Sequence, residues 1–115
     1  MAGVSGVVVV LTTVGRGRGE ELASRLVEDG VAACVSIAPV RSVYFWKGRV
    51  ERDDEDLLII KTSVEMLPEL VSRLRSIHPY EVPELLVIPV MGFGPDYGRW
   101  VEEVTARNKT PSGRG

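Results

Sequence analysis

The stretch that decides the fold runs from residue 78 to residue 90: His78-Pro79-Tyr80-Glu81-Val82-Pro83-Glu84, followed by Leu85-Leu86-Val87-Ile88-Pro89-Val90. Its first two prolines fix two φ angles and push the residues before them out of helical geometry, so a helix ends here and an extended segment begins. The connection is therefore rigid. It carries the protein's one histidine, a phenol and two carboxylates just ahead of an apolar strand, which is more side-chain chemistry than a plain connection needs.

The composition is that of an ordinary soluble domain. The 115 residues are 44% hydrophobic and 26% charged, and we expect one domain over residues 1–107 with a flexible C-terminal tail at 108–115. The longest apolar runs are too short to cross a membrane and the start of the sequence does not resemble a signal peptide, so we expect a cytoplasmic protein without a membrane partner. The net charge of -2 gives no general attraction to nucleic acid, and a single cysteine, Cys34, excludes an internal disulfide.

Hydrophobic periodicity and turn residues predict alternating strands and helices. In chain order they are a strand over 7–14, a helix over 20–29, a strand over 32–46 bent or bulged at Pro39, a hairpin turn at 47–49, a strand over 50–62, a helix over 67–77, a strand over 85–91 and a short helix capped by Asp96. We expect the acidic run at residues 51–56 to be a solvated arm. The order indicates an α+β fold, a ferredoxin-like split βαβ sandwich, βαββαβ plus a C-terminal helix.

The strands carry more apolar residues than such a sandwich needs. Two helices cover only one face of a four-stranded sheet, so the strands of a monomer would alternate between apolar and polar residues. Instead, the strands over 7–14, 50–62 and 85–91 have apolar residues at consecutive positions, and the segment Val43-Tyr44-Phe45-Trp46 is bulky on both sides. A single short helix is too small to cover the second face. We therefore expect an oligomer in which sheets or hairpin arms of neighbouring subunits pack together.

With these residues laid out, the chain resembles the CutA family, the divalent-cation tolerance proteins, from about Val7 to Val104. The motifs that carry the resemblance are Ala32-Ala33-Cys34-Val35, Ser42-Val43-Tyr44 with Trp46-Lys47-Gly48, Ile60-Lys61-Thr62, the run from His78 to Leu85, and Tyr97 with Trp100. Family members are ferredoxin-like homotrimers whose sheets pack edge to edge. The resemblance therefore implies a homotrimer without enzymatic activity. In such a trimer, neighbouring subunits would cover the second, apolar face of the sheet.

The resemblance also implies a divalent metal ion, with Cu²⁺ the ion proposed for the family. The ligands proposed there are a cysteine on the first strand and two adjacent histidines, and the matching positions here are Thr12, Ile77 and His78. Only one of the three keeps a ligand side chain. On this basis the candidate metal ligands are His78, Glu84 and Tyr80, with trimer symmetry bringing groups of a neighbouring subunit close.

Each candidate ligand also has a structural interpretation. The His78 ring could instead cap the C-terminus of the helix over 67–77, facing its free carbonyl groups. The carboxylates Glu81 and Glu84 could form a hard-cation or acid/base pair, but Glu84 could equally bond Lys61 or another subunit. Cys34, between alanine and valine in a strand, is expected to be a small buried hydrophobe.

An alternative function is a small-ligand or signalling trimer that resembles the PII regulators and holds an anionic ligand in clefts between subunits. Lys61 and Arg16 or Arg18 would then meet the ligand. The loop Gly15-Arg16-Gly17-Arg18-Gly19 lies where a helix N-terminus attracts phosphate, but its spacing matches neither a dinucleotide fingerprint nor a P-loop, and a surface turn is the other interpretation. An acylphosphatase activity is excluded because its chemistry needs an asparagine near the loop, and the only one is Asn108.

Overall fold

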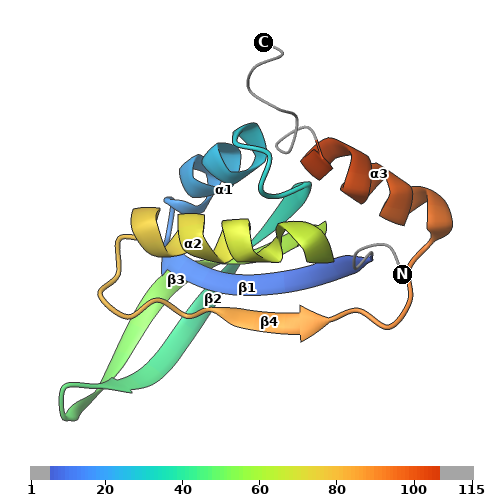
Figure 1. Ribbon diagram of the computed structural model, residues 1–115. Helices are drawn as coiled ribbons and strands as arrows, with labels where there is room; N and C mark the ends of the chain where they lie inside the picture. The colour runs from blue at the N-terminus through green and yellow to red at the C-terminus, as the bar shows by residue number, and fades with distance from the viewer. Residues whose placement is uncertain (1–5, 107–115) are drawn as a thin grey trace.

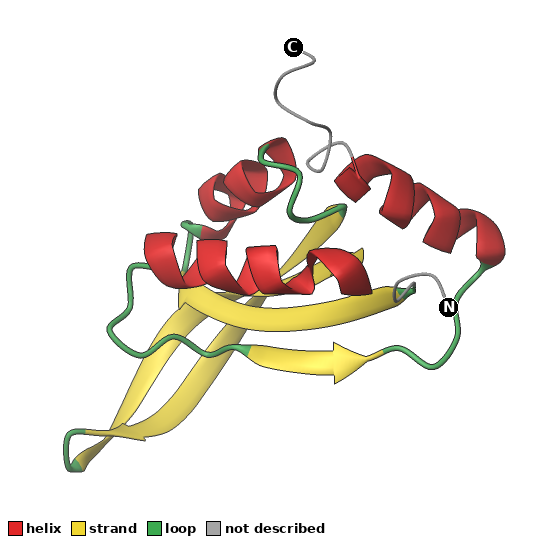
Figure 2. Ribbon diagram, in the orientation of Figure 1, coloured by secondary structure: helices red, strands yellow, loops and turns green. Residues whose placement is uncertain are grey.

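The computed structural model describes residues 6–106, and the expected tail at 108–115 lies outside the described residues. Within that range strands and helices follow one another in the predicted order (Figures 1 and 2). Their bounds are β1 Val7–Gly15, α1 Gly19–Glu28, β2 Cys34–Trp46, β3 Arg49–Ser63, α2 Leu67–Ile77, β4 Leu86–Pro89 and α3 Pro95–Ala106, with one turn of 3-10 helix at Val64–Met66.

The strands form one antiparallel sheet in the order β2-β3-β1-β4. This order is that of a ferredoxin-like split βαβ fold, so the α+β class predicted from the sequence is confirmed. β1 lies inside the sheet because its β-branched residues pair with β3 on one side and with β4 on the other. β2 and β4 are the two edges.

The β2–β3 hairpin is long and regular. Lys47 and Gly48 have φ angles of 50° and 83°, which fits a two-residue turn of type I′. Pairing then continues without interruption to Cys34 and Lys61, so, of the bend or bulge predicted at Pro39, the bulge is wrong. An edge strand tolerates proline, since one of its sides forms no ladder hydrogen bonds. Residues 41–54 of this hairpin, called the arm from here on, reach well beyond the helices (Figure 1).

Alternate strand residues point to the two faces of the sheet, and the main core lies on the face covered by α1 and α2. Its fully buried side chains include Val10, Leu26, Leu58, Ile60, Leu70 and Leu74. On the other face Val7 packs with Val101 of α3. Thr105 of α3 also donates a hydrogen bond to Ser63 Oγ at 3.1 Å, which fixes the helix against the end of β3. α3 therefore covers only the end of this second face that lies away from the arm (Figure 1).

The remainder of the second face has no cover within residues 6–106. Val9 and Leu11 of β1 lie there, paired with Ile88 and Leu86 of β4, and the two β4 side chains are exposed. Ile59 of β3 stands opposite Leu11. The face therefore presents apolar side chains of β1, β3 and β4, interrupted by Lys61 opposite Val9. The oligomer inferred from the sequence stays a prediction that would cover it.

Several boundaries differ by one or two residues from those predicted, and two of the differences have a physical cause. The fourth strand is four residues long because Pro89 cannot donate to a further ladder bond and the residues before Leu86 turn away. Asp96 does not cap α3, since the helix begins at Pro95 and the carbonyl of Gly94 accepts from the N-H of Gly98 at 2.9 Å. Asp96 instead pairs with Arg99 at 2.5 Å.

Candidate functional site

His78 lies where α2 ends, but its ring contacts β1 and not the helix. Its backbone N-H donates to Leu74 O at 2.9 Å and so closes the last turn. The ring Nε2 lies 2.9 Å from Thr13 O and 3.1 Å from Thr12 Oγ1. β4 pairs with β1 only as far as Leu11, so the ring satisfies a carbonyl that β4 does not reach. The possibility that the ring caps the carbonyls of α2 is therefore wrong.

The hydrogen bonds of the His78 ring fix its tautomer. The backbone N-H of Tyr80 donates to Nδ1 at 3.1 Å, so Nδ1 carries no proton. Nε2 then carries the hydrogen and donates it to Thr13 O. Burial lowers the pKa of His78, while the bond to Thr13 and the charge of Glu55 act in the opposite direction. The ring is therefore neutral near pH 7, with its lone pair on Nδ1.

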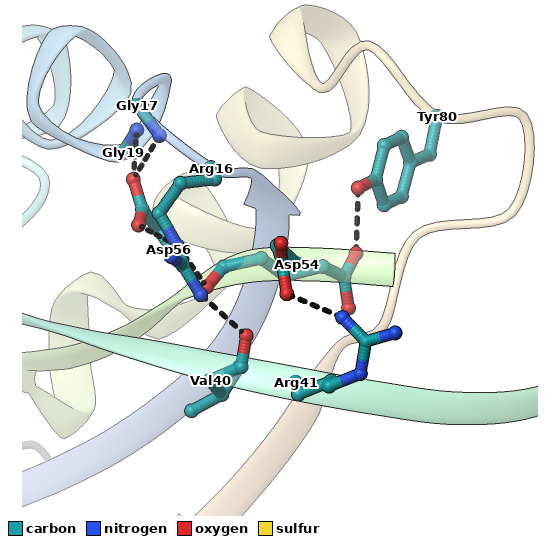
Figure 3. Close-up of polar contacts among 9 residues, drawn as sticks. Arg16, Gly17, Gly19, Val40, Arg41, Asp54, Asp56 and Tyr80 are labelled. Atoms are coloured by element: carbon teal, nitrogen blue, oxygen red, sulfur yellow. Dashed lines mark hydrogen bonds and ion pairs between the residues drawn. The ribbon is translucent and has the colours of Figure 1, made fainter. Parts of the chain in front are cut away.

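Tyr80 joins the segment after α2 to a buried carboxylate. Its phenol donates to Glu55 Oε2 at 2.6 Å (Figure 3). Glu55 is only 5% exposed. Burial, followed by the bond to Glu55, raises the pKa of Tyr80 well above its usual value. The rings of His78 and Tyr80 lie 5.0 Å apart, so imidazole, phenol and carboxylate form one group at the root of the arm.

A similar pair lies further out on the arm. The phenol of Tyr44 donates to Asp53 Oδ2, and this bond raises the pKa of Tyr44 to about 12. Both residues are exposed, in contrast to Glu55. The two phenols therefore hold carboxylates in different surroundings.

Asp56 occupies the glycine-rich loop that the sequence presents as a possible phosphate site. Its Oδ2 accepts from the N-H groups of Gly17 at 2.9 Å and Gly19 at 3.0 Å, and Arg16 Nε lies 3.5 Å from Oδ1 (Figure 3). A Cβ on Gly19 would lie 2.9 Å from that carboxylate, so the close approach requires glycine. The loop thus carries an internal anion at the N-terminus of α1.

The acidic run is therefore not uniformly solvated, and that expectation is wrong at its end. Asp53 and Asp54 are exposed, but Glu55 and Asp56 are buried. Adjacent strand residues point to opposite faces, so Asp56 meets the loop before α1 while Glu55 meets Tyr80. The position of these acids directly before Leu57, where the strand enters the sheet, is the sequence signal that could have revealed them.

The remaining predicted metal ligands lie less close together. Glu84 and Glu81 are exposed, Ile77 is half-buried, and Thr12 is fully buried. Lys61 donates to Ser36 Oγ at 2.7 Å and not to Glu84. Residues 6–106 hold no group of three or more histidine, cysteine, aspartate and glutamate side chains placed to bind a metal ion.

The cationic candidates do not converge within one chain. Lys61 pairs with Val9 near one end of β1, whereas Arg16 follows the other end and donates to Val40 O at 2.8 Å. Cys34 is a free, half-buried thiol. No helix among residues 6–106 has the length and apolar character needed to cross a membrane.

Comparison with known proteins identifies the family. The description "CutA1 divalent ion tolerance protein" belongs to the family profile that matches residues 7–104. Protein CutA of Mus musculus is 45% identical over 75% of this chain and 49% of its own length, and this chain spans about half the length of several such relatives. CutA from Synechococcus elongatus PCC7942 superposes with a TM-score of 0.84 at 38% identity, over 89% of this chain and 92% of that one.

A second solved structure of the same fold is described as PII-like. It is described as the PII-like protein CutA from Nostoc sp. PCC 7120 in apo form, with a TM-score of 0.82 at 37% identity over 85% of this chain and 96% of that one. Sequence motifs, sheet order and these comparisons agree. The chain belongs to the CutA1 divalent ion tolerance protein family.

Proposed function

We propose that the protein is a non-enzymatic, cytoplasmic homotrimer that binds a divalent metal ion, with Cu²⁺ the first ion to test. The observation that carries the proposal is the apolar sheet face that α3 leaves uncovered. Exposed apolar surfaces of this kind are typical of protein interfaces, and closed symmetry lets one surface be covered in every subunit. The arm adds further exposed apolar residues to the same assembly.

The proposed metal ligand is Nδ1 of His78. Metals bind the neutral imidazole, and the lowered pKa of His78 keeps the ring in that form. A bound ion would replace the hydrogen bond from the Tyr80 N-H, while the bond from Nε2-H to Thr13 O would hold the ring in place as an outer contact. Tyr80 and Glu84, from the same or a neighbouring subunit, would add oxygen ligands, which suit Cu²⁺ together with an imidazole.

The test is a calorimetric titration of the chelator-stripped protein with Cu²⁺ and Zn²⁺ near pH 7. We expect one site per subunit, loss of that site in His78→Ala, and weaker binding in Glu84→Gln. Glu81→Gln is the matched control, since Glu81 is an exposed acid of the same segment. Equal binding by wild type and His78→Ala would overturn the metal proposal, and a monomeric mass from light scattering would overturn the trimer.

A second candidate is an anionic ligand held between subunits, which the PII-like description of the Nostoc relative favours. Lys61 and Arg16 are far apart in one chain, so a shared ligand would need two subunits. With pyrophosphate as the probe, binding should persist in His78→Ala and be lost in Lys61→Ala. Retention of binding in Lys61→Ala would exclude this candidate.

A further inference from the structure

A small pocket lies between α1 and the segment that leaves α2, apart from the His78 ring and from the sheet face described above. Its volume is about 90 Å³, enough for roughly three water molecules or a short organic acid. The residues that line it are Val14, Arg18, Glu21, Leu22, Arg25, Ile77 and Pro79. Charged side chains of α1 thus stand opposite apolar side chains of β1 and of the end of α2.

Two guanidinium groups at this pocket lack an acidic partner. Arg18 is the residue directly before α1 and Arg25 lies in the last turn of that helix, so the two stand about two helical turns apart, and both line the pocket. Among residues 6–106, neither appears in an ion pair within 4.0 Å, although Glu21 lies between them in sequence. The pocket therefore carries two positive charges against one negative charge, and both guanidinium groups have unused donors.

The other walls of the pocket are apolar. Val14 and Leu22 are buried, and Ile77 and Pro79 come from the end of α2 and the residue after His78. An inorganic dianion would gain nothing from these walls and would be repelled by Glu21. A monocarboxylate with a short hydrocarbon chain matches both the net charge of one and the apolar surface, since each buried methylene stabilises binding by about 0.8 kcal/mol.

We propose that this pocket is a binding site for a small organic monocarboxylate. The carboxylate accepts hydrogen bonds from Arg18 and Arg25, and the hydrocarbon chain lies against Leu22, Ile77 and Pro79. The site is complete within one chain and uses neither the N-terminal N-H groups of α1 that Asp56 occupies nor any metal ion. It therefore differs from an anion site between subunits that involves Lys61.

Pro79 connects the pocket to the backbone of His78 and Tyr80. It stands between His78 and Tyr80, which contact β1 and Glu55 respectively. A hydrocarbon chain that packs on Pro79 restrains the backbone that carries both side chains. Occupancy of the pocket should therefore reduce hydrogen exchange at the N-H of Tyr80, which donates to His78 Nδ1.

The test uses butyrate as the probe and butyramide as its neutral counterpart of the same shape. Methyl NMR spectra of the full chain, with chelator present, are recorded during each titration. We expect butyrate to shift the methyl signals of Val14, Leu22 and Ile77 in a saturable way, and butyramide and phosphate to bind at least tenfold more weakly. Absence of saturable shifts, or equal binding by butyramide or phosphate, would overturn the proposal.

Charge variants sharpen the test. Arg18→Ala and Arg25→Ala should each weaken butyrate binding about tenfold or more, the usual loss for a charged hydrogen bond. Glu21→Gln should tighten it, since the competing carboxylate is removed, whereas Arg52→Ala on the arm is the matched control and should change nothing. Tighter binding in Arg25→Ala or weaker binding in Glu21→Gln would contradict the assignment. Copper binding by the Arg18→Ala, Arg25→Ala double variant should be unchanged, so this result is separable from the metal proposal.

Discussion

The two ends of the β2–β3 hairpin reverse the usual distribution of side chains. At its root Glu55 and Asp56 are buried, while on the arm Val43, Phe45 and Val50 are exposed, Phe45 by 72%. The buried acids all find donors within the chain: Tyr80 for Glu55, and the glycine loop with Arg16 for Asp56. The root is thus satisfied internally, whereas the apolar side chains of the arm lack cover among residues 6–106. The root therefore serves the fold, and we propose that the arm serves the assembly of the proposed trimer.

The largest effect should come from the root. Asp56→Ala removes the acceptor of two backbone N-H groups and the partner of Arg16, so we expect a loss of roughly 2 to 4 kcal/mol in the free energy of unfolding. Urea denaturation at one fixed protein concentration measures it. Asp54→Ala, two residues earlier on the strand, removes an exposed side chain that pairs with Arg41 and should cost less than about 1 kcal/mol. Equal losses would remove the distinction between root and arm.

A substitution on the arm should change the association of subunits and not the stability of the fold. Phe45→Asp places a charge on the exposed apolar surface, and we expect subunit dissociation to rise about tenfold or more, since buried aromatic residues dominate interfaces. Light scattering after size-exclusion chromatography at several concentrations measures the change. Ser24→Asp adds the same charge to an exposed position of α1 and should leave the mass unchanged. An unchanged mass in Phe45→Asp would show that another surface holds the subunits together.

The two tyrosine-carboxylate pairs offer a finer comparison. Tyr80→Phe leaves the buried Glu55 without its phenol donor and should cost about 1 kcal/mol. Tyr44→Phe frees an exposed Asp53 that water can solvate, so the expected loss is within about 0.5 kcal/mol. Denaturation midpoints of the two variants, measured under the same conditions, show which substitution costs more stability. A larger loss in Tyr44→Phe would mean that the arm pair is buried in the assembled protein.

The smallest effect is a dependence of stability on pH near the root. Burial lowers the pKa of His78 below its ordinary 6.5, so the unfolded chain binds the proton more tightly than the folded one. The stabilisation is fully present above pH 6.5 and is lost as the pH falls through the folded pKa, with a slope of at most about 1.4 kcal/mol per pH unit. Urea midpoints between pH 8 and 5, with chelator present, should show this slope in wild type and a shallower one in His78→Gln.

The sequence predicts the architecture well because periodicity reports which residues point toward a core. The runs around Val10 and Ile60 and the stripe through Leu70 and Leu74 all lie where the pattern predicts. The polar contacts were less predictable, since they depend on register between segments far apart in the chain. The local sequence shows only that Asp56 stands directly before the apolar run from Leu57, which Asp54 does not. Only the pairing of Asp56 with Val14 places it beside the glycine loop.

In the candidate site, too, the backbone could be predicted from local sequence and the long-range contacts could not. The turn at Pro79 and the end of α2 follow from local sequence, and so does the grouping of His78 with Tyr80. That the ring reaches Thr13 follows from the start of β4 at Leu86, which pairs with Leu11, so that β4 does not extend as far as Thr13. The residues at 77–80 predict a rigid connection, but the identity of its partners is a property of the whole sheet.

The central place of β1 has a consequence during synthesis. Its residues leave the ribosome before those of both neighbouring strands, and Ile60, the partner of Val10 on β3, lies about 50 residues later. At translation rates of about 5 to 20 residues per second, this β-branched segment waits roughly 2.5 to 10 s before its first neighbour exists. The β2–β3 hairpin, in contrast, joins strands separated by one tight turn and can close within microseconds of emerging. The nascent chain therefore keeps this β-branched strand unpaired for longest, and a chaperone that captures the nascent chain should act on residues 7–14.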